Sequence, residues 1–269
     1  MTAIKVGIAG LGTIGKVIAR KLAANDVPGV ELDCVSVRDP TRAQAFLDGI
    51  GSQAHIYAIE GLAREADVII ECAPASAFGE IAVPVLTAGK SFIAVSAGQL
   101  LERPDLIQLA MEYGSQIIVP TGALIGLDAV TAAAEGEIHS VAMITRKPVK
   151  GLLGAPYLER RGIDIADITQ TVRIFQGSAR EAARGFPENV NVAAALALAG
   201  IGPDRTTIEI WADPTLTRNV HRIVVESDSA SFEMSIQNIP SENPKTGRIT
   251  ALSVVAALRK LRAPLRVGT

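Results

Sequence analysis

The chain has 269 residues, 48% of them hydrophobic and 20% charged, which is the composition of a globular protein with room for two domains of roughly 100–200 residues each. Its 26 basic and 28 acidic residues give a formal net charge of −2; without a basic block, the chain lacks the signature of a nucleic-acid-binding protein. No apolar run reaches the roughly 18 residues that a membrane-spanning helix needs, and we expect a cytoplasmic protein with no membrane contact.

Strand and helix patterns alternate in the N-terminal part of the chain. Helical spacing covers residues 13–24 and 41–47. The apolar runs of strand length lie at residues 4–9, 31–37, 66–73, 91–97 and 115–123. This alternation predicts βαβ units and a doubly wound parallel sheet, as in a Rossmann domain. Two cysteines fall within these runs without metal-ligand spacing, so we expect free thiols and no metal site.

The sequence GLGTIG follows the first predicted strand and opens the first predicted helix. Gly10 permits the tight turn, Gly12 lets the backbone approach a pyrophosphate, and Gly15 lets the helix pack closely on the sheet. Together with Thr13 and Ile14 at the helix N-terminus, which favours negative charge, these residues predict a dinucleotide site. A GxGxxG pattern alone is weak evidence; the strand before it and the helix after it make the prediction strong.

The second predicted strand ends in VSVRDPTR. An acid at this position binds the ribose hydroxyls of NAD, whereas a nearby arginine accommodates the 2′-phosphate of NADP. Asp39 fits the first role, and Arg38 or Arg42 fits the second, so the cofactor is NAD or NADP. A solvated charged turn is the structural alternative for each arginine.

The pattern changes beyond about residue 137. Strand-like runs lie at residues 206–212, 219–227 and 230–238, and the first and last alternate apolar and polar residues as antiparallel strands do. Helices are expected at 192–200 and 246–261. We expect a second α+β domain with an antiparallel or mixed sheet at 125–242, for substrate binding. Residues 1–124 and 243–269 would form the dinucleotide-binding domain.

His221 lies near the start of the strand-like run at 219–227, with Asn219 on the same face. A histidine has an unperturbed pKa near working pH and can handle a substrate proton. On the pattern alone, a packed core histidine is the more common interpretation.

Several stretches together resemble the L-aspartate dehydrogenase family, and the resemblance extends over nearly the whole chain. The most specific are FPENVNVAAALALAG at 186–200 and NVH at 219–221, because neither follows from a generic dinucleotide-binding pattern. The others are GLGTIG, ECAP, PTGALIGLDAV, TRKP, GAPYL and NPKTG.

The resemblance implies NAD(P)-dependent oxidation of L-aspartate to iminoaspartate, which hydrolyses to oxaloacetate and ammonia. It implies Ala123 and Asn189 as cofactor contacts and His221 as the catalytic residue. Ala73, within ECAP, is a further candidate for a cofactor contact. The resemblance further implies a homodimer whose second domain forms the interface.

The two carboxylates of such a substrate need cationic or amide partners. Lys147 and Arg146, in TRKP, are our candidates, together with Asn219. Other basic side chains that could bind a carboxylate are Arg218, Arg222, Lys245 and Arg248.

Two other functions stay open at this point. The first is another two-domain NAD(P)-dependent reductase. Among these, a sugar dehydrogenase would carry an EKP motif, but this chain has VSAGQ at 95–99. A dinucleotide-sensing regulator without turnover is the other, and the presence of His221 argues against it.

Overall fold

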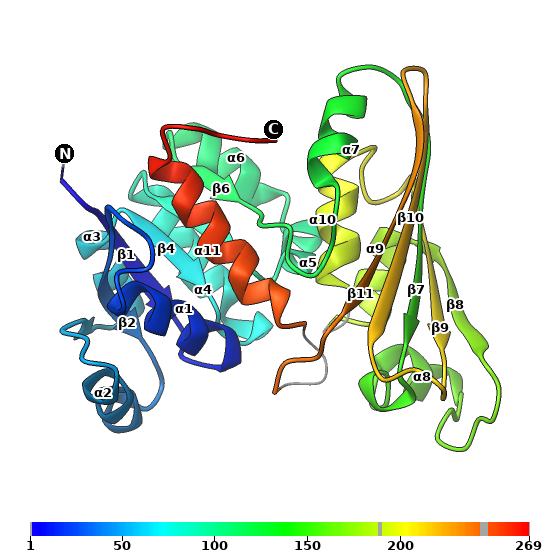
Figure 1. Ribbon diagram of the computed structural model, residues 1–269, viewed down its shortest axis with the longest axis horizontal. Helices are drawn as coiled ribbons and strands as arrows, with labels where there is room; N and C mark the ends of the chain where they lie inside the picture. The colour runs from blue at the N-terminus through cyan, green and yellow to red at the C-terminus, as the bar shows by residue number, and fades with distance from the viewer. Residues whose placement is uncertain (1, 188–189, 243–246, 269) are drawn as a thin grey trace. The chain divides into compact units, whose positions relative to one another are not determined.

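The computed structural model describes residues 2–187, 190–242 and 247–268 of the chain. It divides into two compact units. The first contains the residues up to Pro120 together with Ala251–Arg266, and the second contains Thr121–Thr250 and the chain end from Val267. Each unit has its own sheet (Figure 1).

The first unit is built on a six-stranded sheet in the order β3-β2-β1-β4-β5-β6. All of its strand pairs are parallel, which confirms the predicted doubly wound sheet. The two-residue strand β3 was not predicted. The strands are β1 (Ile4–Ala9), β2 (Val30–Ser36), β3 (His55–Ile56), β4 (Val68–Glu71), β5 (Ser91–Ala94) and β6 (Gln116–Ile118).

Helices of the first unit contribute to two separate hydrophobic clusters, one on each face of the sheet, because successive strand residues point to opposite faces. One cluster holds Val6 and Ile8 of β1 with side chains of α1, α2 and α11. The other holds Ile69 of β4 with side chains of α3, α4 and α6. The helices are α1 (Thr13–Ala23), α2 (Pro40–Gly49), α3 (Ile59–Glu65), α4 (Phe78–Thr87), α5 (Gly98–Glu102), α6 (Asp105–Glu112) and α11 (Ile249–Arg262). The C-terminal helix α11 thus packs into the first unit through Val254 and Leu258.

The second unit is built on a mixed five-stranded sheet in the order β11-β10-β7-β9-β8. Strands β7 and β9 are parallel, and the other neighbours are antiparallel. Although β9 and β10 follow each other in the sequence, they do not pair, because β7 lies between them. The strands are β7 (Ile138–Lys147), β8 (Val172–Ser178), β9 (Thr206–Ala212), β10 (Asn219–Ser227) and β11 (Ser231–Asn238).

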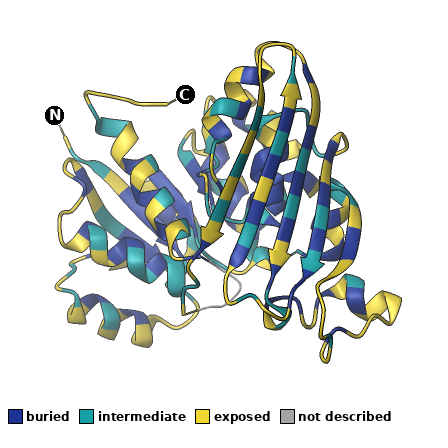
Figure 2. Cartoon of the chain, turned by 45° about the vertical axis from the view of Figure 1, so that its right-hand side comes forward, coloured by how far each residue is buried: buried dark blue, intermediate teal, exposed yellow. Residues whose placement is uncertain are grey.

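One face of the second sheet is covered by helices α7 (Leu127–Ala134), α9 (Ala179–Gly185) and α10 (Asn191–Ala199) (Figure 1). Helix α10 is rich in alanine and contacts both α7 and α9, and its small side chains allow this close packing. Figure 2 looks onto the other face, where exposed and half-buried residues alternate with buried ones. The short helix α8 (Pro156–Arg161) packs against α9.

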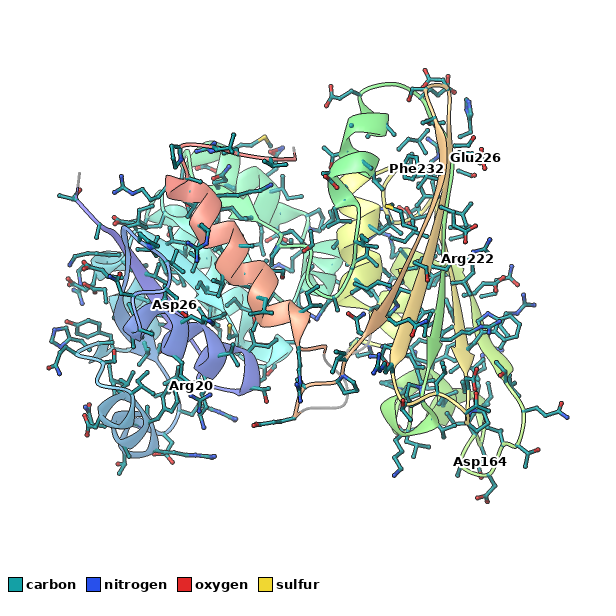
Figure 3. All side chains as sticks on the ribbon, viewed as in Figure 1. Arg20, Asp26, Asp164, Arg222, Glu226 and Phe232 are labelled. Atoms are coloured by element: carbon teal, nitrogen blue, oxygen red, sulfur yellow. The ribbon has the colours of Figure 1, made fainter. Side chains whose placement is uncertain are left out.

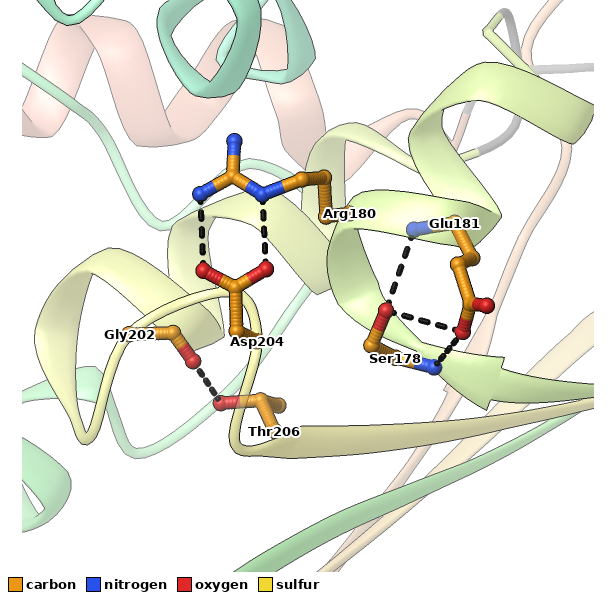
Figure 4. A network of polar contacts seen from close by, with 6 residues as sticks. All are labelled: Ser178, Arg180, Glu181, Gly202, Asp204 and Thr206. Carbon is orange, nitrogen blue, oxygen red and sulfur yellow. Dashed lines mark hydrogen bonds and ion pairs between the residues drawn. The ribbon is translucent and has the colours of Figure 1, made fainter.

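Polar contacts fix the start of α9 (Figure 4). Ser178 and Glu181 form a reciprocal capping box. Arg180 donates two hydrogen bonds to Asp204, with Nε–Oδ1 at 2.7 Å and Nη2–Oδ2 at 2.9 Å. Because Asp204 lies just before β9, this pair connects the helix to the sheet that carries the candidate site.

Glu71 is a buried acid at the end of β4, with 0% of its surface exposed. Its carboxylate accepts hydrogen bonds from the backbone N–H of Ser96 at 2.8 Å and from its hydroxyl at 3.1 Å. Burial raises the pKa of this carboxyl to about 7, although the bonds from Ser96 oppose the rise. Glu71 therefore connects the carboxyl ends of β4 and β5.

The raised pKa of Glu71 predicts a pH-dependent stability. The unfolded chain ionises this group near pH 4.5 and the folded chain near pH 7, so the unfolding free energy falls as pH rises between these values, by about 3 kcal/mol at most. Glu71→Gln stays neutral and should lack this part of the pH dependence in urea unfolding at pH 5 and pH 8. The exposed Glu80→Gln on α4 is the control. Equal pH dependence in wild type and Glu71→Gln would contradict the assignment.

Candidate active site

The glycine loop has the geometry of a phosphate-binding turn. Gly10 has φ +99°, and a Cβ placed there would meet Cys72 O at 2.6 Å and Ala73 N at 2.9 Å. A Cβ on Gly15 would lie 2.1 Å from Gly10 O. Both positions therefore require glycine. By contrast, a Cβ on Gly12 would meet no atom within 4 Å, so this side of the loop is open to a ligand.

Helix α1 begins at Thr13 without a side-chain cap and without an acidic residue in its first turn. The first N–H groups of a helix have no partner within the helix and carry partial positive charge. Those of Thr13 and Ile14 therefore suit an anion such as a pyrophosphate. The residues present fit a bound dinucleotide.

Asp39 lies three residues beyond the last residue of β2, at the N-cap of α2. Its Oδ1 accepts a hydrogen bond from the backbone N–H of Arg42 at 3.0 Å. Arg38 and Asp39 are both exposed. The acid expected to bind ribose therefore has a structural role in starting a helix.

A second group of polar side chains lies at one end of the second sheet, where β7 ends and β10 begins. Thr145 and His221 are paired across these strands, with Oγ1 and Nδ1 3.1 Å apart. Lys147 follows Thr145 by two residues and so shares its face. All three are buried, with exposed fractions of 2–3%. The structure thus brings His221 and Lys147, which were predicted separately, into one buried group.

Burial and charge shift the pKa values of this group. Burial lowers the pKa of Lys147 to about 7. Burial, and secondarily the nearby charge of Lys147, lowers the pKa of His221 to about 3. The imidazole is therefore neutral at physiological pH, while the amine is close to its titration point.

Asn219 extends this group along β10. It is buried and lies opposite Asn238 of β11. The Asn238 Nδ2 group donates to the carbonyl of Ala123 at 2.8 Å, which ties the turn after Thr121 to the end of the sheet. Its Oδ1 is buried and has no hydrogen-bond partner among the described residues.

Arg146 lies away from this group. It is exposed, between the buried Thr145 and Lys147, and its guanidinium lies 5.9 Å from the ring centre of Trp211. Arg222 also points outward from β10 (Figure 3) and is paired with Glu233. Of these basic candidates, Lys147 alone shares the face of His221.

Asn189 and Lys245 lie outside the described residues. The other two histidines, His55 and His139, are exposed. Within the described part of the chain, no cluster of three or more His, Cys, Asp or Glu could hold a metal. No described helix is long and apolar enough to span a membrane.

Sequence reasoning missed three buried polar residues: Thr145, Asn238 and Glu71. Each had a local signal. Thr145 lies two residues before the end of β7 and Asn238 ends β11, both at positions where alternation predicts a buried side chain, and Glu71 closes the apolar run ADVII.

Two families match the chain. "Aspartate dehydrogenase, C-terminal" matches residues 128–261. "Homoserine dehydrogenase, NAD binding domain" matches residues 10–120, which include the glycine loop.

Relatives of high identity cover almost the whole chain. L-aspartate dehydrogenase of Bradyrhizobium diazoefficiens is 57% identical over 99% of this chain and 94% of its own length. L-aspartate dehydrogenase 3 of Bordetella bronchiseptica is 56% identical, over 98% of this chain and 97% of its own.

Solved structures share the fold. Aspartate dehydrogenase from Thermotoga maritima superposes with a TM-score of 0.73 at 21% identity, covering 98% of this chain and 99% of its own. Scyllo-inositol dehydrogenase from Lactobacillus casei, with bound NAD(H) and scyllo-inositol, reaches a TM-score of 0.53 at 12% identity, over 96% of this chain and 88% of its own. These two similarities concern the fold alone. On the strength of the full-length relatives and the matching C-terminal family, the chain belongs to the L-aspartate dehydrogenase family and is an NAD(P)-dependent oxidoreductase.

Proposed function

We propose that the protein oxidises L-aspartate to iminoaspartate, reversibly, and that water converts the product to oxaloacetate and ammonia. The observation that carries the proposal is the buried group of Lys147, Thr145 and His221 at one end of the second sheet. Oxidation of an amino acid removes a hydride from Cα and a proton from the ammonium group. The dinucleotide, when bound, accepts the hydride; the protein has to bind the carboxylates and take the proton.

The first unit holds the dinucleotide in this proposal. Gly10, Gly12 and Gly15 form the turn, and the N–H groups of Thr13 and Ile14 face the pyrophosphate. Ala73, whose backbone lies against Gly10, lines the same turn. The family resemblance adds Ala123 and Asn189 as proposed cofactor contacts.

His221 is the proposed general base. For Nε2 to accept a proton, Nδ1 has to carry the ring hydrogen and donate it to Thr145 Oγ1, at the observed 3.1 Å. The neutral state of the ring leaves Nε2 able to accept the ammonium proton. A pKa of about 3 makes the free imidazole a weak base, and the negative charge of bound substrate carboxylates raises that pKa toward the working range.

Lys147 is the proposed partner of a substrate carboxylate. A buried ammonium is stabilised by an anion, and the same anion raises its lowered pKa, so binding keeps Lys147 charged. The Asn219 amide can donate to the second carboxylate. Arg146 lies on the opposite side of β7 and is the weaker candidate for this role.

A second copy of the chain is the proposed partner. Support comes from the face of the second sheet that lies opposite α7, α9 and α10. This face carries the half-buried residues Ile144, Val220, Val224 and Trp211 among charged ones. Half-buried apolar side chains on a sheet face suit an interface between subunits.

The substrate proposal is tested by the reduction of NAD and, separately, of NADP with L-aspartate and a panel of other amino acids. We expect turnover with L-aspartate alone. His221→Ala should lower kcat by roughly 10²–10⁴-fold, with dinucleotide dissociation constants unchanged, whereas the exposed His139→Ala should retain activity. Turnover with a different amino acid would refute the substrate assignment, and an active His221→Ala would refute the role of the histidine.

The substitution Lys147→Met distinguishes carboxylate binding by Lys147 from proton transfer by His221. Loss of a charged hydrogen-bond partner should raise KM for L-aspartate by about 10–100-fold. Because the charge of Lys147 lowers the pKa of His221, its removal should raise that pKa and move the acid limb of the kcat/KM profile to higher pH. Arg146→Met, one residue away but exposed, is the matched control. Equal effects of the two substitutions on KM would contradict the assignment.

A further inference from the structure

Asn238 lies at the polar end of the second sheet. It pairs directly with Asn219 across β10 and β11, and residues paired in this way point to the same face of a sheet. Asn219 shares that face with His221, two residues further along β10. Asn238 therefore lies on the same face as the buried group of Lys147, Thr145 and His221.

The orientation of the Asn238 amide is fixed by Ala123. A backbone carbonyl can only accept a hydrogen bond, so the Nδ2 group of Asn238, 2.8 Å from Ala123 O, has to face it. The Oδ1 atom, which can only accept, is then left for another partner. No described residue donates a hydrogen bond to Oδ1, although the side chain is only 3% exposed.

A buried acceptor without a donor is destabilising, and most such atoms in folded proteins have a partner. The neighbouring Gly247 has no side chain that could supply one; a Cβ placed there would lie 3.2 Å from Oδ1. Lys147 and His221 are buried to the same extent as Asn238. A substrate that reaches these two groups therefore has to open the same end of the sheet, where Oδ1 needs a donor.

The required donor restricts the chemistry of the ligand. A carboxylate has only acceptor atoms and cannot satisfy Oδ1. L-aspartate carries two carboxylates, and its only hydrogen-bond donors at neutral pH are the N–H bonds of its ammonium group. The nitrogen of iminoaspartate keeps such a donor, whereas succinate and oxaloacetate, as dianions, have none.

We propose that Oδ1 of Asn238 accepts a hydrogen bond from the amino group of the bound substrate, and so selects amino dicarboxylates over dicarboxylates without nitrogen. An ammonium group has three N–H bonds, so one can face Asn238 while another faces Nε2 of His221. The inference rests on the proposed function and adds the residue that recognises the reacting nitrogen.

Calorimetric titration with L-aspartate and with succinate tests this, because the two ligands differ only in the amino group. The full-length protein is first saturated with reduced dinucleotide, which cannot accept a hydride, so that no turnover occurs. In Asn238→Leu, the dissociation constant for L-aspartate should rise about tenfold more than that for succinate. Loss of the bond to Ala123 affects both ligands alike and leaves the ratio of their constants unchanged.

Two further variants separate this role from a structural one. Asn219→Leu removes an amide that faces a carboxylate in the proposed function, so it should weaken the binding of both ligands to the same extent. The exposed Gln237→Ala, next to Asn238 but on the other face of β11, should leave both constants unchanged. Asn238→Ala takes the place of Asn238→Leu if the larger apolar side chain prevents folding.

An unchanged ratio of the two constants in the Asn238 variant would overturn the inference and leave the proposed function intact. Weaker binding of the dinucleotide without a change in that ratio would do the same, because the amide would then face the cofactor. Failure of the wild-type protein to bind L-aspartate would overturn the inference and the proposed function together.

Discussion

The burial of the Lys147 amine beside the His221 imidazole is the constraint on which the proposed chemistry of this site depends. Lys147 and His221 are almost fully buried on one face of the second sheet, and each is more easily kept neutral there than in water. A site of this kind is short of negative charge. In the proposed function, a dicarboxylate substrate supplies it, stabilises the ammonium of Lys147 and strengthens His221 as a base. Substrate recognition and proton transfer would then be coupled through the same electrostatics.

In the proposed function, each unit has the role that its fold suits. A parallel sheet with a glycine turn at its carboxyl edge supplies N–H groups and a helix dipole for a phosphate anion. A mixed sheet with helices on one face supplies a dry surface on which buried polar side chains can be aligned by strand register. Glu71 and Asn238 play comparable roles, since each uses a buried polar group to hold a loop at the end of a sheet.

Local features could be predicted from the sequence, whereas features that depend on long-range strand pairing could not. The glycine loop was predictable because strand, turn and helix follow one another within a few residues. The contact between Thr145 and His221 joins residues 76 positions apart and depends on β7 lying between β9 and β10, which no local pattern specifies. The same register decides that Lys147 and not Arg146 shares the face of His221. The role of Asp39 depended on where β2 stops and α2 begins, a boundary that patterns place poorly.

The most direct test is to monitor the protonation state of His221 by NMR of its imidazole nitrogens. The spectra are recorded with and without succinate, an unreactive dicarboxylate. With three histidines in the chain, a His221→Ala spectrum assigns the signal. We expect the imidazole of His221 to be still neutral at pH 5 in the free protein. Its pKa should be higher when succinate is bound. A His221 that titrates near its usual 6.5 in the free protein, or that does not respond to succinate, would contradict the account.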